Sequence, residues 1–316
     1  MEQLTDLKAI LYSKRANIYY LEMCRVLQKD GRVLYLSENK KEYQYWNIPI
    51  ANTTCLLLGT GTSITQPAMR MLAQAGVLVG FVSGGGTPLL MANEVEWFTP
   101  QSEYRPTEYL QGWMGFWFDD AKRLETARRF QVARIEFIQK VWTKDRELKL
   151  EGFDIGELEK ELSSALSNIS TAHSVGKLLQ LEADLTKRLY KHAAKKTNQL
   201  GFTRERSNAD RANDFLDHGN YLAYGLGATT LWVLGIPHGF AVMHGKTRRG
   251  ALVFDVADLI KDAIILPWAF VCAKEKQSEK EFRAQCLQSF VEHKALDFIF
   301  DEVKKAALFY EEEENL

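Results

Sequence analysis

The alternation of apolar and polar positions divides the chain into two parts with different secondary structure. Up to about residue 95 the apolar residues form short runs between turn residues, which is typical of β-strands. Strands are predicted at residues 9–12, 18–27, 33–36, 55–58 and 77–82. Lys29-Asp30-Gly31 predicts a hairpin, the glycines within 59–61 and 84–86 predict turns, and one helix is expected at 65–75, ended by Gly76.

From residue 99 onward the apolar positions recur with helical spacing, and no proline occurs between Pro106 and Pro237. Because proline interrupts helices, this interval can hold long ones. Helices are predicted at residues 107–118, 119–146, 155–169, 174–197, 210–235, 256–265, 279–294 and 295–312. The chain is therefore predicted to be α+β, with a small β domain over residues 1–98 and a larger all-α domain over residues 99–316.

Composition agrees with two ordinary globular domains. The chain has 316 residues, more than one compact domain usually contains, and 46% of them are hydrophobic. The four cysteines have no regular spacing and are expected to be reduced core residues. The first residues lack a secretory signal, which favours a cytoplasmic protein. Residues 221–236 are the only membrane candidate, and their three glycines and the following Pro237 favour a buried core helix.

Charge is clustered locally although the net charge is only -1. Between Lys187 and Arg211 there are eight Lys or Arg residues and two acids, a local charge of +6. This run is typical of a surface that binds a nucleic-acid backbone, and a solvated helix face would explain part of it equally well.

The segment 241–258 combines groups that suit metal-assisted phosphoryl chemistry. His244 can ligate a divalent ion, and Asp255 and Asp258 add oxygen ligands. Between His244 and Asp255 lie three cations that can neutralise a DNA backbone, Lys246, Arg248 and Arg249. The two aspartates lie where a helix is predicted to start, so capping of that helix is an alternative explanation for them.

Glu182 is a further candidate because it falls on an apolar helix stripe. Leu178, Leu185 and Leu189 mark that stripe, and Glu182 lies four residues after the first and three before the second. An unpaired buried charge is costly, so an inward Glu182 needs a cation, either a metal ion or an arginine. A glutamate at the edge of the stripe that reaches water or pairs with an arginine is the alternative.

Nucleotide-binding motifs are incomplete. Gly245-Lys246-Thr247 resembles the end of a P-loop, but Phe240 occupies the position of the required first glycine. Neither glycine-rich segment of the β domain has the full Gly-x-Gly-x-x-Gly spacing. We therefore interpret these glycine-rich segments as turns.

Four segments together resemble the CRISPR-associated adaptation integrases, the Cas-one family, and are most similar to the subtype I-F form. They are residues 56–65, Glu182 followed by Tyr190, residues 217–225, and His244 with residues 254–259. The resemblance implies an N-terminal β-sandwich-like domain used for dimerisation and partner contacts, and an all-α catalytic domain. It also implies an Mg²⁺- or Mn²⁺-dependent DNA integrase and endonuclease that joins the 3′-hydroxyl ends of short spacer DNA into the repeat array by transesterification.

Carried over residue by residue, the resemblance makes Glu182, His244 and Asp258 the metal ligands. It places Asp255 as an additional catalytic acid and Tyr224 near the reacting DNA. Together with the cations noted above, the expected DNA contacts are Lys246, Arg248, Arg249, Lys261, Arg204, Arg206, Lys280 and Arg283.

The resemblance also implies partners. They are double-stranded DNA with 3′ ends, CRISPR repeat DNA, a second copy of the chain, and a Cas-two subunit fused to the Cas-three helicase-nuclease. No membrane contact is expected. Two alternatives remain at this point: a stand-alone metal-dependent nuclease acting on branched DNA, and a non-catalytic DNA-binding scaffold.

Overall fold

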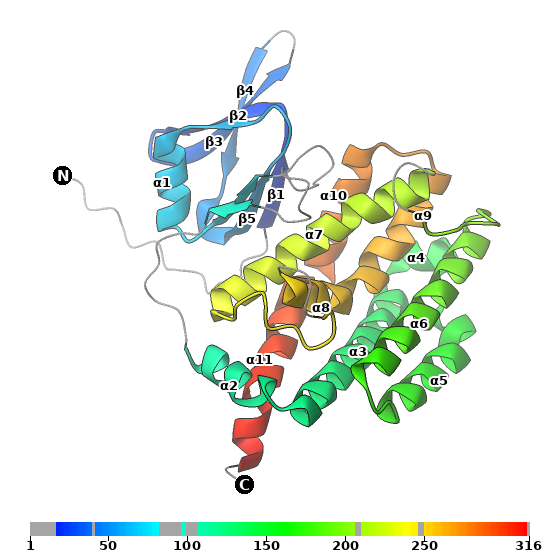
Figure 1. The fold of residues 1–316 in the computed structure, drawn as a ribbon. Coiled ribbons are helices and arrows are strands. Elements are labelled where there is room, and N and C mark those ends of the chain that lie inside the picture. Colours follow the sequence, from blue (N-terminus) through cyan, green and yellow to red (C-terminus); the bar gives the residue numbers. More distant parts are fainter. Residues whose placement is uncertain are drawn as a thin grey trace. The chain divides into compact units, whose positions relative to one another are not determined.

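The computed structural model divides into two compact units, Met1–Arg105 and Pro106–Leu316 (Figure 1). The structure describes residues 17–39, 42–81, 96–98, 107–205, 210–245 and 250–314. The strand predicted at 9–12 and the glycine turn at 84–86 lie outside these residues. Each unit is described by itself.

In its described residues, the first unit contains two four-stranded sheets and one α-helix. One sheet has the order β1-β5-β7-β8 and the other β4-β3-β2-β6. The strands are β1 (Asn17–Leu21), β2 (Cys24–Lys29), β3 (Arg32–Asn39), β4 (Glu42–Ile48), β5 (Thr53–Leu58), β6 (Ser63–Ile64), β7 (Leu78–Phe81) and β8 (Glu96–Phe98). Buried residues from both sheets and from α1 (Gln66–Gln74), among them Val26, Leu56 and Leu72, form one core, so the predicted β-sandwich-like domain is confirmed.

Local sequence explains most of this unit. The predicted hairpin is confirmed: Lys29 pairs with Arg32, and the two turn residues Asp30 and Gly31 both have positive φ, as a type I′ turn requires. The strand predicted at 18–27 is wrong in its continuity, because Met23 has a φ of 50° and separates β1 from β2.

Strand β4 was not predicted because it lies at the edge of its sheet. Tyr45 and Trp46 are half exposed there, and the strand lacks the apolar run on which the prediction relied. An edge strand needs fewer buried side chains than a central one, so the apolar pattern does not reveal it.

The second unit is helical, and its helix bounds follow the predicted ones closely for most of its length. The helices are α2 (Glu108–Trp117), α3 (Asp120–Lys144), α4 (Arg146–Leu150), α5 (Glu159–Ser170), α6 (Val175–Lys196), α7 (Arg211–Leu234), α8 (Ala251–Ile260), α9 (Leu266–Lys274), α10 (Glu279–Glu292) and α11 (Ala295–Glu314). A short 3₁₀ turn covers Ile155–Leu158 in this unit, and another covers Ile50–Asn52 in the first unit. Asp119 and Ser174 cap the starts of α3 and α6 by accepting backbone N–H bonds. Helices α3, α5 and α6 lie side by side (Figure 1).

The prediction of a helix at 256–265 was wrong in its bounds. Helix α8 starts at Ala251, after Gly250 in the left-handed conformation, and a π turn over Lys261–Ile265 leads into α9. Asp255 and Asp258 therefore lie inside α8, and neither caps its start. The explanation of these aspartates as helix caps is excluded.

Pro267 accounts for part of the irregularity after α8. Proline has no N–H to donate to the carbonyl four residues before it, which is that of Ala263. The indole Nε1 of Trp142 on α3 donates to this oxygen at 2.9 Å. A side chain from a distant helix thus takes the role of the missing backbone donor.

Two further predictions concern burial. Residues 221–234 form the second half of α7, and residues 221–236 are largely buried, as expected for a core helix. Among the described residues, no helix is long and apolar enough to span a membrane. All four cysteines are free and buried, which confirms that they are core residues.

Candidate metal centre

Three side chains from separate elements of the helical unit converge on one point. They are Glu182 of α6, His244 of the segment between α7 and α8, and Asp258 of α8, and one potential ligand atom of each lies within 4.8 Å of the others. His244 Nε2 is 3.9 Å from Glu182 Oε2 and 3.7 Å from Asp258 Oδ2. These are the three residues predicted as metal ligands.

Glu182 points inward as its position on the apolar stripe predicts. Leu178, Leu185 and Leu189 are buried, and the Glu182 side chain is 18% exposed. Burial, and then the negative charge of Asp258, raise the pKa of Glu182 above its usual value, whereas Arg134 and His244 oppose this shift. The cations that face Glu182 thus offset only part of the shift caused by burial and by Asp258.

His244 is oriented by Asp255. Asp255 Oδ1 lies 2.7 Å from His244 Nδ1, and as a carboxylate it accepts a hydrogen bond from the N–H at that nitrogen. In the neutral imidazole, Nε2 is then left with its lone pair directed at Glu182 and Asp258. Burial opposes the charged imidazole, but the hydrogen bond that His244 donates to Asp255 and the nearby carboxylates raise the pKa of His244 to about 8. A metal ion bound at Nε2 would displace the proton that the charged imidazole carries on this nitrogen.

Asp255 also fixes the segment that carries His244. Its Oδ2 accepts from the backbone N–H of Val242 and Met243, and its Oδ1 from that of His244. Its side chain is 1% exposed. Asp255 therefore acts on the cluster through His244, and its oxygens are occupied by this segment.

Two tryptophans of α2 anchor the same segment. The indole of Trp113 donates to the carbonyl of Phe240 at 3.1 Å, and that of Trp117 donates to the carbonyl of Ala241 at 2.8 Å. The backbone before His244 is thus attached to α2, and the backbone at His244 is attached to α8.

Lys261 contacts both Asp258 and Tyr224. The ammonium group of Lys261 pairs with Asp258 Oδ1 and lies 5.6 Å from the centre of the Tyr224 ring. Burial opposes the charge of Lys261, but the carboxylate of Asp258 raises its pKa well above the usual value. The Asp258 pKa is lowered despite burial, chiefly because of Lys261 and His244. The expected DNA contact Lys261 is thus paired with Asp258, a residue of the cluster.

Arg134 of α3 was missed by the sequence analysis. Its side chain is 2% exposed, its Nη1 is 3.7 Å from Glu182 Oε1, and its Nε donates to Asp262 Oδ2 at 2.8 Å. The signal was available, because Arg134 lies midway between Phe130 and Ile138 on a buried helix stripe. The same reasoning that selected Glu182 selects Arg134 as the partner of a buried acid.

The remaining expected DNA contacts differ in accessibility. Lys280 is exposed, whereas Arg283 is 5% exposed and pairs with Glu279, so its guanidinium is not presented to a ligand. Arg204 pairs with Asp217 and donates to Asn213 Oδ1. Lys246, Arg248, Arg249 and Arg206 lie outside the described residues.

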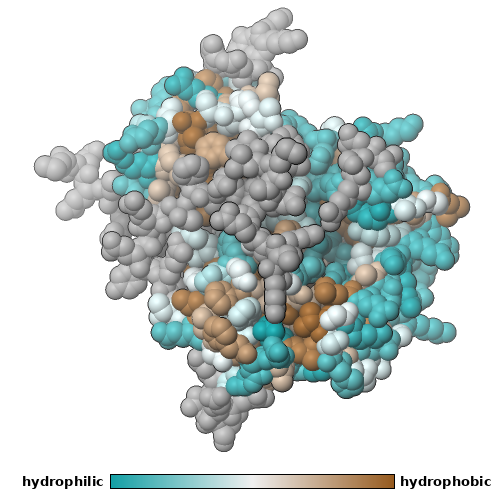
Figure 2. All heavy atoms as spheres, in the orientation of Figure 1, coloured by the Kyte–Doolittle hydropathy of each residue, from teal (hydrophilic) through white to brown (hydrophobic). Residues whose placement is uncertain are grey.

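A groove of about 730 Å³ adjoins the cluster and includes Glu182 in its lining. It follows α6 and the segment after it, and Tyr190, Phe202 and Leu200 supply apolar surface. Its cations are Lys187, Lys191 and Arg204. Hydrophilic side chains dominate the side of the unit formed by α5 and α6 (Figure 2), and Lys187 and Lys191 are exposed there.

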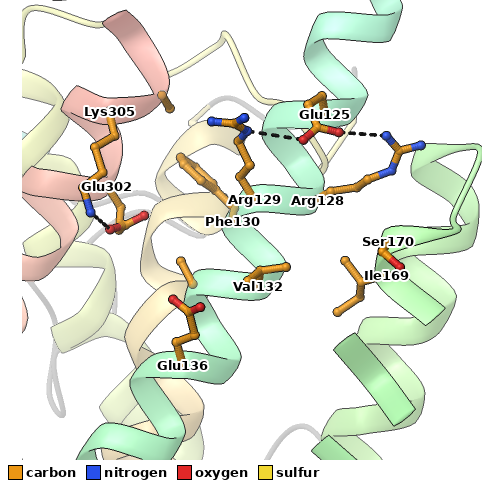
Figure 3. A pocket seen from close by; sticks show the side chains of 12 residues that line it. Glu125, Arg128, Arg129, Phe130, Val132, Glu136, Ile169, Ser170, Glu302 and Lys305 are labelled. Atoms are coloured by element: carbon orange, nitrogen blue, oxygen red, sulfur yellow. Dashed lines mark hydrogen bonds and ion pairs between the residues drawn. The ribbon is translucent and has the colours of Figure 1, made fainter. Parts of the chain in front are cut away.

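A separate pocket of about 420 Å³ lies between α3, α5 and α11 (Figure 3). It shares no lining residue with the cluster. Glu125 pairs with both Arg128 and Arg129, and Glu302 pairs with Lys305. Because most of its charged groups are satisfied by one another, this pocket offers little to a charged ligand.

The donor set of the cluster fits a divalent ion. Two carboxylates and one imidazole suit Mg²⁺ and Mn²⁺, with the imidazole favouring Mn²⁺ slightly. The imidazole nitrogen that faces the carboxylates is the one left free by Asp255. The residues that would hold the ion are Glu182, His244 and Asp258.

The fold and the site thus describe a two-unit protein whose helical unit carries a candidate metal centre. The chain belongs to the family described as "CRISPR associated protein Cas1", which it matches over residues 18–304. It is 58% identical over 311 residues to the "CRISPR-associated endonuclease Cas1" of Pseudomonas aeruginosa (strain UCBPP-PA14), with 96% of each chain covered. It is 53% identical to the protein of the same name from Pectobacterium atrosepticum, with 96% of this chain and 95% of that one covered. The predicted family is confirmed.

Solved structures share the fold at low sequence identity. A casposase bound to an integration product superposes with a TM-score of 0.70 at 13% identity, over 94% of this chain and 91% of that one. A "TtCas1-DNA complex" superposes with a TM-score of 0.67 at 20% identity, over 92% and 90% of the two chains. At these identities the similarity concerns the fold alone.

Proposed function

We propose that the chain is a divalent-metal-dependent DNA endonuclease and integrase of CRISPR adaptation. It joins the 3′-hydroxyl ends of short spacer DNA into the repeat array by transesterification, in the cytoplasm of a prokaryotic cell. The observation that carries the proposal is the convergence of Glu182, His244 and Asp258 within 4.8 Å. The names of the relatives at 58% and 53% identity support the endonuclease class.

The residues of the cluster have separate tasks in this reaction. A bound Mg²⁺ or Mn²⁺ would supply Lewis acidity to the phosphoryl oxygens. Glu182 and Asp258 provide its negative ligands and His244 its neutral one, while Asp255 holds the imidazole in one tautomer and one orientation. Exchange of one phosphodiester for another needs no nucleotide energy source, which agrees with the incomplete P-loop.

The groove along α6 is the proposed path of a DNA strand toward the cluster. Lys187, Lys191 and Arg204 can neutralise phosphates, and Phe202 and Leu200 present apolar surface to bases. Leu200 is 80% exposed, so its side chain is accessible to such a strand. Lys280 is an additional proposed contact, and Tyr224 is proposed to lie near the reacting DNA.

The proposed assembly is a homodimer that acts with a Cas-two subunit, fused in this subtype to the Cas-three helicase-nuclease. The N-terminal β domain is the proposed site of dimerisation and partner contacts. Light scattering at micromolar concentration tests the dimer directly, and a monomer would contradict it.

Strand transfer with Mn²⁺ tests the function. Labelled DNA with 3′-hydroxyl ends is incubated with a repeat-containing target, with and without the partner subunit. Wild-type protein should give joined products, whereas Asp258→Ala and Asp258→Asn should give none. Asp301→Ala changes an exposed carboxylate of α11 and should behave as wild type. Cleaved products without joined ones would favour a stand-alone nuclease, and full integration by folded Asp258→Asn would refute the proposed centre.

A further inference from the structure

We propose that Arg134 is a positioning residue that directs the carboxylate of Glu182 toward the metal ion. The inference rests on the proposed metal centre and adds a group that lies on a third helix, α3. Arg134 is 2% exposed, so it cannot contact a DNA strand itself. Its effect on the reaction must therefore pass through the residues that it touches.

The two oxygens of Glu182 face different partners. Oε1 lies 3.7 Å from Arg134 Nη1, and Oε2 lies 3.9 Å from His244 Nε2. The guanidinium forms an ion pair with one oxygen, and the other oxygen faces the imidazole and Asp258. Without Arg134, the long Glu182 side chain could rotate and withdraw its ligand oxygen from the cluster.

Arg134 is itself held from several sides. Its Nε donates to Asp262 Oδ2 at 2.8 Å, and its Nη2 donates to Thr186 Oγ1 at 2.6 Å. Thr186 lies on α6 one turn after Glu182, so the same guanidinium contacts α6 twice. A lysine has one charged nitrogen and cannot reproduce this forked set of contacts.

The network extends to the segment that carries His244. Arg134 Nη1 donates to Gln131 Oε1 at 2.9 Å, and Gln131 Nε2 lies 3.4 Å from Met243 Sδ. Helix α3 thus contacts the proposed ligand Glu182 through Arg134, and it contacts Met243, the neighbour of His244, through Gln131. This is what a positioning residue requires, because ligand geometry depends on the groups behind the ligands.

Arg134 also balances the charge of a second buried acid. It neutralises Asp262 by direct pairing, and Lys261 pairs with Asp258. Loss of Arg134 would leave Asp262 buried without its partner, so the protein could be destabilised for that reason alone. The test must therefore separate metal affinity from stability.

The experiment measures Mn²⁺ binding by calorimetry and by electron paramagnetic resonance, beside the melting temperature. Arg134→Lys and Arg134→Met are compared with wild type, and Arg134→Met/Asp262→Asn removes the orphaned carboxylate to restore folding. Arg128→Met is the matched control, because Arg128 is on the same helix and pairs with Glu125 in the separate pocket (Figure 3). Both Arg134 single variants and the double variant should bind Mn²⁺ about 10- to 100-fold more weakly, and Arg128→Met should bind it normally.

Asp258→Asn distinguishes failure of this inference from failure of the metal centre. If Asp258→Asn binds Mn²⁺ as wild type does, the metal centre itself is wrong. If Asp258→Asn loses the ion and folded Arg134→Met/Asp262→Asn keeps wild-type affinity, the role of Arg134 is overturned. A second readout uses the Glu182→Gln background. Because Arg134 acts through Glu182, adding Arg134→Met to this background should weaken Mn²⁺ binding little further. A full additional loss of Mn²⁺ affinity would contradict the inference.

Discussion

His244 Nδ1 lies 2.7 Å from Asp255 Oδ1, and this contact determines which imidazole nitrogen faces Glu182 and Asp258. The two aspartates of α8 therefore differ in role although they are three residues apart. Asp258 faces the centre, and Asp255 holds the segment that brings His244 to it.

The first prediction concerns this division of roles. Asp255→Asn leaves only one side-chain oxygen as an acceptor. That oxygen can accept either from the N–H groups of Val242 and Met243 or from His244, and the other set of donors loses its acceptor. We expect Mn²⁺ affinity and strand-transfer rate to fall about 10- to 100-fold. Calorimetry and the joining assay measure both, with Asp301→Asn as an exposed control. Unchanged affinity would show that Asp255 does not orient the imidazole.

The second prediction concerns the π turn after α8. Trp142→Phe removes the donor to the Ala263 carbonyl and leaves a buried acceptor unsatisfied, which should lower the free energy of unfolding by about 1–3 kcal/mol. Pro267→Ala restores a backbone N–H that can donate to the same oxygen. The loss caused by Trp142→Phe should therefore be smaller in the Pro267→Ala background. Denaturant titration of the four proteins checks this, and strictly additive losses would contradict it.

The third prediction compares two helical glycines. A Cβ at Gly219 of α7 would lie 2.4 Å from Ile265 Cγ2 and 3.0 Å from Phe282 Cζ, whereas one at Gly176 of α6 would meet nothing within 4 Å. Gly219→Ala should destabilise the protein by about 1–3 kcal/mol through overpacking. Gly176→Ala should stabilise it by about 0.4–1 kcal/mol because alanine favours the helix. Thermal unfolding of both variants tests the difference in sign.

The fourth prediction concerns stability at low pH. Burial opposes the charge of Asp145, but hydrogen bonds from His293 Nε2 and the backbone N–H of Leu148 lower its pKa below the usual value. A lowered folded-state pKa contributes stability that is present above the unfolded-state value of about 3.9 and is lost as the pH falls through the folded one.

Asp145→Asn tests this linkage because asparagine can still cap α4. The variant should be less stable than wild type at pH 7 by about 1–3 kcal/mol. The difference should shrink as the pH falls from about 4 toward 2, which unfolding at several pH values measures. Asp154→Asn, an exposed cap, is the control. A difference that is independent of pH would exclude the charge of Asp145 as its cause.

Helical and strand periodicity predicted much of the architecture. The spacing of Leu178, Leu185 and Leu189 predicted the inward direction of Glu182, since the direction of a helical side chain follows from its position relative to its neighbours on the same helix. The ligand types were also readable, because imidazole and carboxylate groups bind divalent ions wherever they converge.

The tertiary structure decided which of these groups meet. Helix α8 begins after Gly250 and ends at the π turn, and the indole of Trp142 from another helix donates a hydrogen bond to a carbonyl of that turn. The choice between Asp255 and Asp258 as ligand depends on where the segment with His244 packs, and the partner of Glu182 comes from α3. Periodicity describes one element at a time, whereas these contacts join elements far apart in the chain and exist only once the helices have packed.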